Sequence, residues 1–117
     1  MPGEGPAYDF HGCEVVMKTT GVETLGQLAV MESRYPPGLA VPSHVHDGED
    51  EMFYLLAGRV ELFCEDDEWV ATPGTFVFVP RDHRHGFTVL GDEEARALVV
   101  VGPPQLDGQV AQYPRLR

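Results

Sequence analysis

Apolar and polar residues alternate along most of this chain in short runs, a pattern that is typical of half-buried β-strands. Glycine, proline or acidic residues bound the runs, as expected where strands end in turns. The predicted strands are 14–19, 25–35, 52–57, 59–64, 68–72, 75–79, 85–90 and 95–101. No stretch has the periodicity of an amphipathic helix of useful length, so the pattern predicts an all-β fold.

The same pattern suggests how the chain is divided. Residues 1–12 are rich in Gly, Pro and Ala with little alternation, and we expect a loose N-terminal arm that docks on a partner subunit. Residues 13–102 hold the strands and should form a single domain, followed by a surface tail over 103–117. Short strands in one small domain can close into a barrel or jelly roll, whose mouth suits a ligand.

Composition narrows the classes of partner. The chain has 117 residues, 43% of them apolar, which is enough for one core. Nineteen acidic residues against 8 Lys plus Arg give a charge of -11, which opposes binding to nucleic acid or to an anionic membrane. Without a signal peptide or a long apolar run, we expect a cytoplasmic protein. Cys13 and Cys64 form no C-x-x-C pattern and are expected to be free thiols.

Four histidines occur in two pairs, which is unlike scattered structural histidines. His44 and His46 project from the same face of a strand, because the side-chain period of a strand is two. A turn through 47–48 would return Glu51 toward them, and His85 would complete the set from a distant strand. Imidazole and carboxylate ligands suit one divalent ion of Zn, Fe, Mn, Ni, Co or Cu.

These residues resemble the first motif of the cupin family, G(X)5HXH(X)3-4E(X)6G. Gly38, His44, His46, Glu51 and Gly58 match it in full. The resemblance implies a cupin jelly-roll β-barrel.

The second cupin motif, G(X)5PXG(X)2H(X)3N, is matched in part. Gly74, Pro80 and His85 agree with it, whereas Asp82 replaces its last glycine and Val89 its asparagine. Aspartate tolerates a left-handed turn better than most residues, so we expect Asp82 to preserve the turn. The resemblance implies metal ligands at the motif positions, namely His44, His46, Glu51 and His85.

Other residues near the motifs are candidates for binding or catalysis. Phe53 and Phe87 should point to the metal face by strand parity, either as substrate contacts or as barrel core. Arg81 and Arg84 either steer an anionic substrate or lie solvated in a loop. His83 has no counterpart in the motif; it is either an acid or base, a support for the ligands, or a solvated turn residue.

The remaining polar candidates are expected at the surface. His11 stands alone in the N-terminal arm, and the acidic runs 47–51 and 65–68 are most simply solvated turns, apart from Glu51.

Three functions fit this pattern. Resemblance to small quercetin-dioxygenase-like cupins favours O2-dependent oxidation of a small enol or hydroxy-carbonyl substrate, with Glu51 as ligand or base. The alternatives are isomerase, cyclase or lyase chemistry without oxygen, and a barrel that binds a small ligand without turnover. The resemblance also implies a homodimer.

Overall fold

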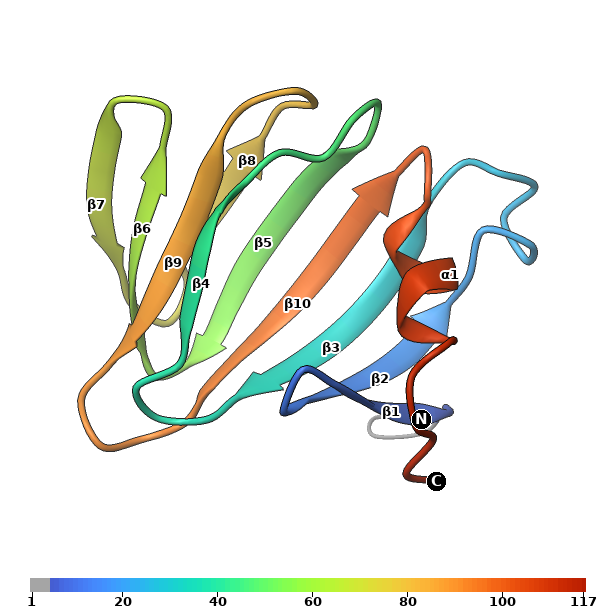
Figure 1. Ribbon diagram of the computed structural model, residues 1–117, viewed down its shortest axis with the longest axis horizontal. Helices are drawn as coiled ribbons and strands as arrows, with labels where there is room; N and C mark the ends of the chain where they lie inside the picture. The colour runs from blue at the N-terminus through green and yellow to red at the C-terminus, as the bar shows by residue number, and fades with distance from the viewer. Residues whose placement is uncertain (1–4) are drawn as a thin grey trace.

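A computed structural model describes residues 5–117 of the chain as two antiparallel β-sheets and one short helix (Figure 1). The elements are β1 (Ala7–Phe10), β2 (Cys13–Thr19), β3 (Ala29–Tyr35), β4 (Ala40–His44), β5 (Asp50–Ala57), β6 (Arg59–Cys64), β7 (Asp67–Ala71), β8 (Phe76–Val79), β9 (His85–Leu90), β10 (Ala95–Gly102) and α1 (Leu106–Val110). The all-β prediction is confirmed.

The two sheets form the walls of a jelly-roll barrel. The larger sheet has the order β1-β2-β3-β10-β5-β8 and the smaller one β4-β9-β6-β7. The smaller sheet lies at the left of Figure 1 and the larger one extends to the right. Neighbours in these sheets are often distant in sequence, so residues far apart along the chain meet between the walls.

Alternation along the strands produces the core. In β10, Ala95, Ala97, Val99 and Val101 are buried while the residues between them are partly exposed. Side chains from both sheets, Leu55 on β5 and Val60 on β6 among them, join one apolar cluster. Burial of this cluster is the main force that holds the sheets together.

Most predicted strands agree closely with the structure, and two have the same bounds as predicted, 59–64 and 85–90. The predicted strand 25–35 begins only at Ala29, because residues 21–26 form turns in which Leu25 and Gly26 have positive φ. Strand β4 was not predicted from alternation, since Pro42 interrupts it and most of its residues are exposed.

The two ends of the described chain pack against each other. Residues 1–4 of the expected loose arm lie outside the described residues, and residues 7–10 form β1, which pairs with β2. On its other side the backbone N–H of Asp9 donates to the carbonyl of Pro114 over 2.8 Å. Part of the expected tail is α1, whose Val110 is 1% exposed. Strand β1 therefore belongs to the larger sheet, and the C-terminal segment packs against it.

Two findings bear on the compositional predictions. Cys13 and Cys64 are both free thiols, as predicted. Within residues 5–117 no helix has the length and apolar character needed to cross a bilayer.

Candidate metal centre

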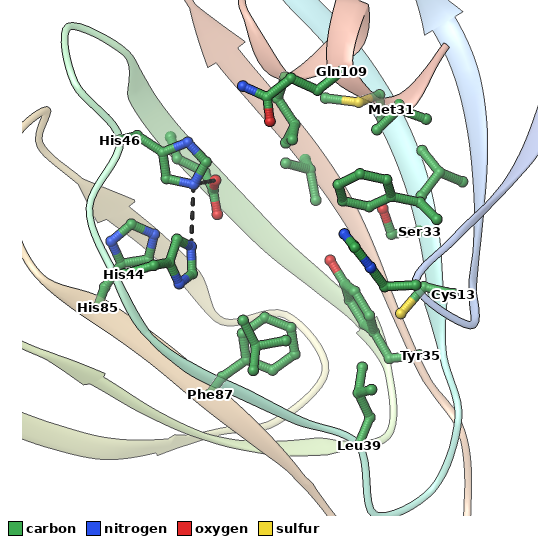
Figure 2. Close-up of a pocket in the computed structure, with 18 of the residues that line it drawn as sticks. Cys13, Met31, Ser33, Tyr35, Leu39, His44, His46, His85, Phe87 and Gln109 are labelled. Atoms are coloured by element: carbon green, nitrogen blue, oxygen red, sulfur yellow. Dashed lines mark hydrogen bonds and ion pairs between the residues drawn. The ribbon is translucent and has the colours of Figure 1, made fainter. Parts of the chain in front are cut away.

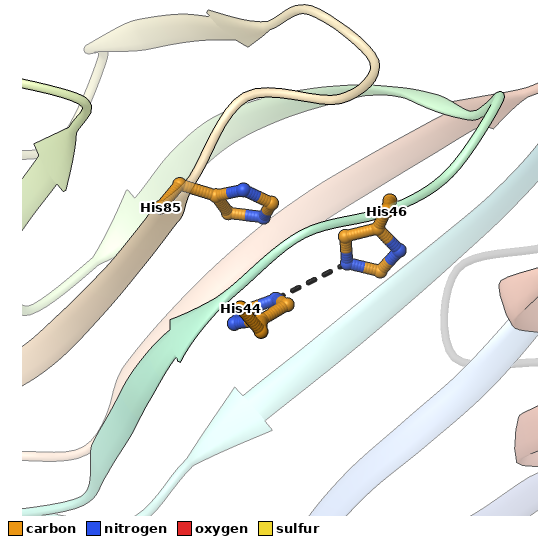
Figure 3. Close-up of side chains that lie close together, drawn as sticks. All are labelled: His44, His46 and His85. Carbon is orange, nitrogen blue, oxygen red and sulfur yellow. Dashed lines mark hydrogen bonds between the residues drawn. The ribbon is translucent and has the colours of Figure 1, made fainter.

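Three imidazoles meet at one end of the barrel (Figure 3). His44 ends β4 and His85 begins β9, and the two residues are paired in the smaller sheet. His46 follows β4 in the turn toward β5. One nitrogen from each ring lies within 4.8 Å of the others, so the three rings can hold a single ion.

Backbone carbonyls fix the orientation of two of these rings. Nδ1 of His44 lies 2.9 Å from the carbonyl oxygen of Pro42, and Nδ1 of His85 lies 2.9 Å from that of His83. Because a carbonyl oxygen only accepts, the proton of each neutral ring is on Nδ1. The Nε2 lone pairs of His44 and His85 are therefore available to a ligand.

Glu49 fixes the third ring. Nδ1 of His46 lies 3.0 Å from Oε1 of Glu49, and a carboxylate also only accepts. The proton of neutral His46 is therefore on Nδ1 as well, and its Nε2 faces Nε2 of His44 across 3.1 Å.

The resulting arrangement fits a divalent transition metal. Two Nε2 lone pairs at 3.1 Å repel each other unless a proton or a cation lies between them. Nε2 of His85 is buried without any hydrogen-bond partner, which is costly for a polar atom. A cation bound by all three Nε2 atoms would remove the repulsion between two of them and give Nε2 of His85 a partner. His44, His46 and His85 therefore have the donor set that such a metal requires.

Glu51, the fourth predicted ligand, lies beside this cluster on β5. Its Oε2 is 3.5 Å from Nε2 of His46, and its side chain is 15% exposed. Burial raises the pKa of Glu51, although the nearby His46 charge opposes the shift. Its carboxylate is positioned either to complete the ligand set or to take up a proton, and its role stays a prediction.

The protonation of the histidines differs with their surroundings. Burial lowers the pKa of His85, so its ring is neutral and able to bind a metal near neutral pH. The hydrogen bond to Glu49 raises the pKa of His46, although burial opposes it. In the metal-free protein a proton on His46 would relieve the contact with His44.

Glu49 was expected to be a solvated turn residue, and this prediction is wrong. Its side chain is only 1% exposed. Its Oε2 accepts the backbone N–H of Gln105 and, over 2.8 Å, that of Leu106. Because these partners lie 56 and 57 residues away, no local pattern in the sequence reveals the burial of Glu49. Only its position three residues after a ligand histidine was a signal.

A cavity of about 580 Å³ opens next to the histidines (Figure 2). Its volume is in the usual range for small-molecule sites, about 300–1,000 Å³. Apolar side chains such as Met31, Leu39 and Phe87 form most of its lining. The hydroxyl end of Tyr35 points into it, and burial raises the pKa of this phenol, which therefore stays protonated.

His11 also lines the cavity, although it was expected only at the surface. It sits at the tip of the β1–β2 hairpin with a φ of 55°. Its Nε2 lies 2.9 Å from the hydroxyl of Tyr113 in the C-terminal segment. The ring is exposed and borders the cavity.

The other predicted site residues lie elsewhere. Within residues 5–117 the cavity lining includes Phe87 but not Phe53. Phe53 is 3% exposed and lies in the core, and its ring centroid is 6.0 Å from that of Phe87. His83 is exposed, and Arg81 forms an ion pair with Asp50 at 3.2 Å. The roles of Phe53, His83 and Arg81 in catalysis or binding stay predictions.

Within the part of the chain that the structure describes, Arg84 also lies outside the cavity lining. Its guanidinium donates a hydrogen bond to Ser43 Oγ over 3.2 Å. Its predicted contact with substrate likewise stays a prediction. Asp82, by contrast, has a φ of 66°, so the departure from the second motif does preserve the left-handed turn. Its backbone N–H donates to the carbonyl of His46, which ties the two motifs together.

The fold and the three-histidine cluster define a small β-barrel with a potential metal site. Residues 31–101 match the family described as Cupin domain. This chain belongs to the cupin family, as its motifs predicted.

Curated relatives include Protein SchB of Streptomyces halstedii, 34% identical over 73% of this chain and 60% of its own length. Polyketide synthase CurC of Streptomyces cyaneus is 32% identical over 65% of this chain and 47% of its own. Quercetin 2,3-dioxygenase of Bacillus subtilis is 33% identical over 55% of this chain and 19% of its own. The chain thus spans about half, or less, of the length of most of these relatives.

Among solved structures, an RmlC-like cupin from Shewanella frigidimarina superimposes with a TM-score of 0.76. The match covers 92% of each chain at 17% identity. This likeness supports the fold alone.

Proposed function

We propose that this cupin is a metal-dependent enzyme that oxidises a small enol or hydroxy-carbonyl substrate with O2, as a dioxygenase does. The observation that carries the proposal is the convergence of three Nε2 atoms beside a cavity of about 580 Å³. Similarity to a quercetin 2,3-dioxygenase favours oxygen as the second substrate. A divalent transition metal at the three histidines would supply Lewis acidity and, if redox-active, electron exchange with O2.

The chain's own groups have complementary tasks. Glu51 is the proton acceptor, because its carboxylate lies beside the histidines and its raised pKa brings it closer to neutral pH. Tyr35 donates a hydrogen bond from its protonated hydroxyl to a substrate oxygen. The ring of Phe87, edge-on to Tyr35 at 4.9 Å, provides an apolar wall that excludes water.

The decisive experiment measures oxygen uptake and product together. Protein loaded with Fe²⁺, Mn²⁺, Ni²⁺ or Cu²⁺ is incubated with a flavonol or a 1,3-diketone in air and under argon. We expect product only in air, with one O2 consumed per substrate. Tight binding of these compounds without product would contradict the enzyme proposal and favour a ligand-binding barrel.

A non-oxidative reaction is the second candidate, because one relative is a polyketide synthase protein. In that case Glu51 would move a proton of the substrate during isomerisation or cyclisation, with the metal only polarising a carbonyl. Equal turnover in air and under argon would support this candidate over the dioxygenase.

We also propose that two copies associate through the outer face of the larger sheet. Tyr54 on β5 is paired with Phe76 on the edge strand β8, and Met52 with Phe78. The exposed fractions of Tyr54, Phe76 and Phe78 are 41%, 61% and 51%, an unusual apolar patch for a lone domain. Light scattering after size exclusion should give twice the chain mass, and Phe76→Glu should halve it.

A further inference from the structure

We infer that Glu49 is a positioning residue that selects the tautomer of His46 and joins the metal site to α1. The inference rests on the proposed metal site. Glu49 lies in the turn between β4 and β5 and is not one of the ligand positions of the two cupin motifs. Its two carboxylate oxygens face different parts of the molecule, the ligand His46 on one side and the start of α1 on the other.

The burial of Glu49 shows how tightly this carboxylate is held. Charged side chains are almost never fully buried unless they are paired, yet this one is 1% exposed. Oε2 accepts the backbone N–H groups of Gln105 and Leu106, and Oε1 contacts Nδ1 of His46. Oε2 thus has two backbone donors, whereas Oε1 has no hydrogen-bond partner other than the 3.0 Å ion-pair contact with Nδ1 of His46.

For His46 this arrangement determines which nitrogen can bind a metal. Because the carboxylate oxygen of Glu49 lies 3.0 Å from Nδ1, the ring proton is favoured on Nδ1, and the lone pair of the neutral ring is on Nε2, which faces His44. Partners of this kind raise the basicity of a ligating histidine and hold its ring in place. Unlike the carbonyls behind His44 and His85, the acceptor behind His46 is a side chain and can be substituted.

The same carboxylate couples the site to the wall of the cavity. Leu106, Gln109 and Val110 of α1 line the cavity, and Glu49 holds the first turn of this helix. A ligand that strengthens the contact between His46 and Glu49 therefore also favours the packing of α1 against Glu49, which we call the docked position of α1. By thermodynamic reciprocity, docking of α1 favours the metal-binding tautomer of His46.

The substitution Glu49→Gln tests the effect of Glu49 on the tautomer of His46 separately from a loss of the fold. The two backbone N–H groups at Gln105 and Leu106 require an oxygen, so the amide NH2 of the glutamine must face His46. The NH2 would donate to Nδ1, which moves the ring proton to Nε2 and blocks the metal. The matched control is Asp107→Asn, since Asp107 also anchors α1, through the backbone N–H of Gly21 at 2.8 Å, without touching a histidine.

The test compares Zn²⁺ affinity by competition with a chromophoric chelator, alongside thermal unfolding of each metal-free protein. We expect Glu49→Gln to bind Zn²⁺ about 10–100-fold more weakly than wild type, and Asp107→Asn to bind within twofold. Equal affinity of wild type and Glu49→Gln would overturn the inference and leave the proposed metal site intact. Absence of Zn²⁺ binding by wild type would instead overturn the proposed function.

A measurement on the wild type keeps the inference testable if Glu49→Gln does not fold. Nitrogen-15 NMR of the metal-free protein, at a pH where the rings are neutral, distinguishes the two imidazole tautomers. We expect the proton of His46 on Nδ1. A proton on Nε2 would overturn the inference.

Discussion

Substitution of Gly86 by alanine should damage both the fold and the proposed metal site, because this glycine of β9 has no room for a Cβ beside the backbone of β4. A Cβ at position 86 would lie 2.6 Å from the carbonyl oxygen of Val41 on β4 and 2.7 Å from the Phe63 ring on β6. Carbon contacts are relaxed only at about 3.5 Å. The strands on either side must therefore move apart by about 1 Å, since the oxygen of Val41 cannot rotate away.

This displacement acts directly on the ligands. His85 immediately precedes Gly86, and His85 is paired with His44 on β4. Metal–ligand distances tolerate shifts of only about 0.2 Å, so we expect Zn²⁺ affinity to fall at least tenfold. Overpacking should also cost about 2 kcal/mol, which corresponds to a Tm lower by about 8 °C for a domain of this size.

Circular dichroism on heating and chelator competition measure the two effects. Gly108→Ala is the control, because position 108 lies in α1 and an added Cβ there meets nothing within 4 Å. We expect the control to keep its affinity and to gain stability of up to about 1 kcal/mol. Unchanged Tm and affinity in Gly86→Ala would refute the reasoning that strand separation controls the site.

Three further predictions concern the site and its motifs. His44→Ala and His85→Ala should each lose the metal found in wild type by element analysis, whereas His83→Ala, with its ring outside the cavity lining of residues 5–117, should retain it. In the metal-free protein, burial raises the pKa of Glu49, but the contacts with His46, Leu106 and Gln105 outweigh burial and hold this pKa below its ordinary value. Glu49 therefore stabilises the fold above the ordinary pKa of a glutamate, and the advantage of wild type over Glu49→Gln in urea unfolding should shrink as the pH falls through the lowered pKa. Asp82→Gly relieves a positive φ but loses the hydrogen bond from Gly48, so urea unfolding should change by less than about 1 kcal/mol.

The sequence was most informative where structure depends on neighbours in the chain. The bounds of β6 were predicted to the residue, because buried and exposed residues alternate along its first part. The bounds of β9 were also predicted to the residue, although none of its residues is fully exposed. The spacing of His44 and His46 and their distant partner His85 anticipated the cluster. The strand period does not account for His46, which lies in the turn after β4 and not on the strand as predicted. The fixed spacing of the motif is what anticipated its place in the cluster.

Features that depend on contacts between distant segments could not be predicted. Glu49 has the same local pattern as its solvated neighbours, and only the start of α1 makes it a buried group. Strand β1 forms in an irregular Gly- and Pro-rich segment because β2 and residue 114 supply its partners. His11 borders the cavity only because the β1–β2 hairpin folds against it.

The unequal anchoring of the three rings has an evolutionary consequence. Main-chain oxygens orient His44 and His85, and every amino acid supplies such an oxygen, so mutation of the anchoring position leaves the acceptor in place. The ring of His46 depends on the side chain at position 49. A single codon change at position 49 would therefore alter the anchor of His46 without altering any of the proposed ligands themselves.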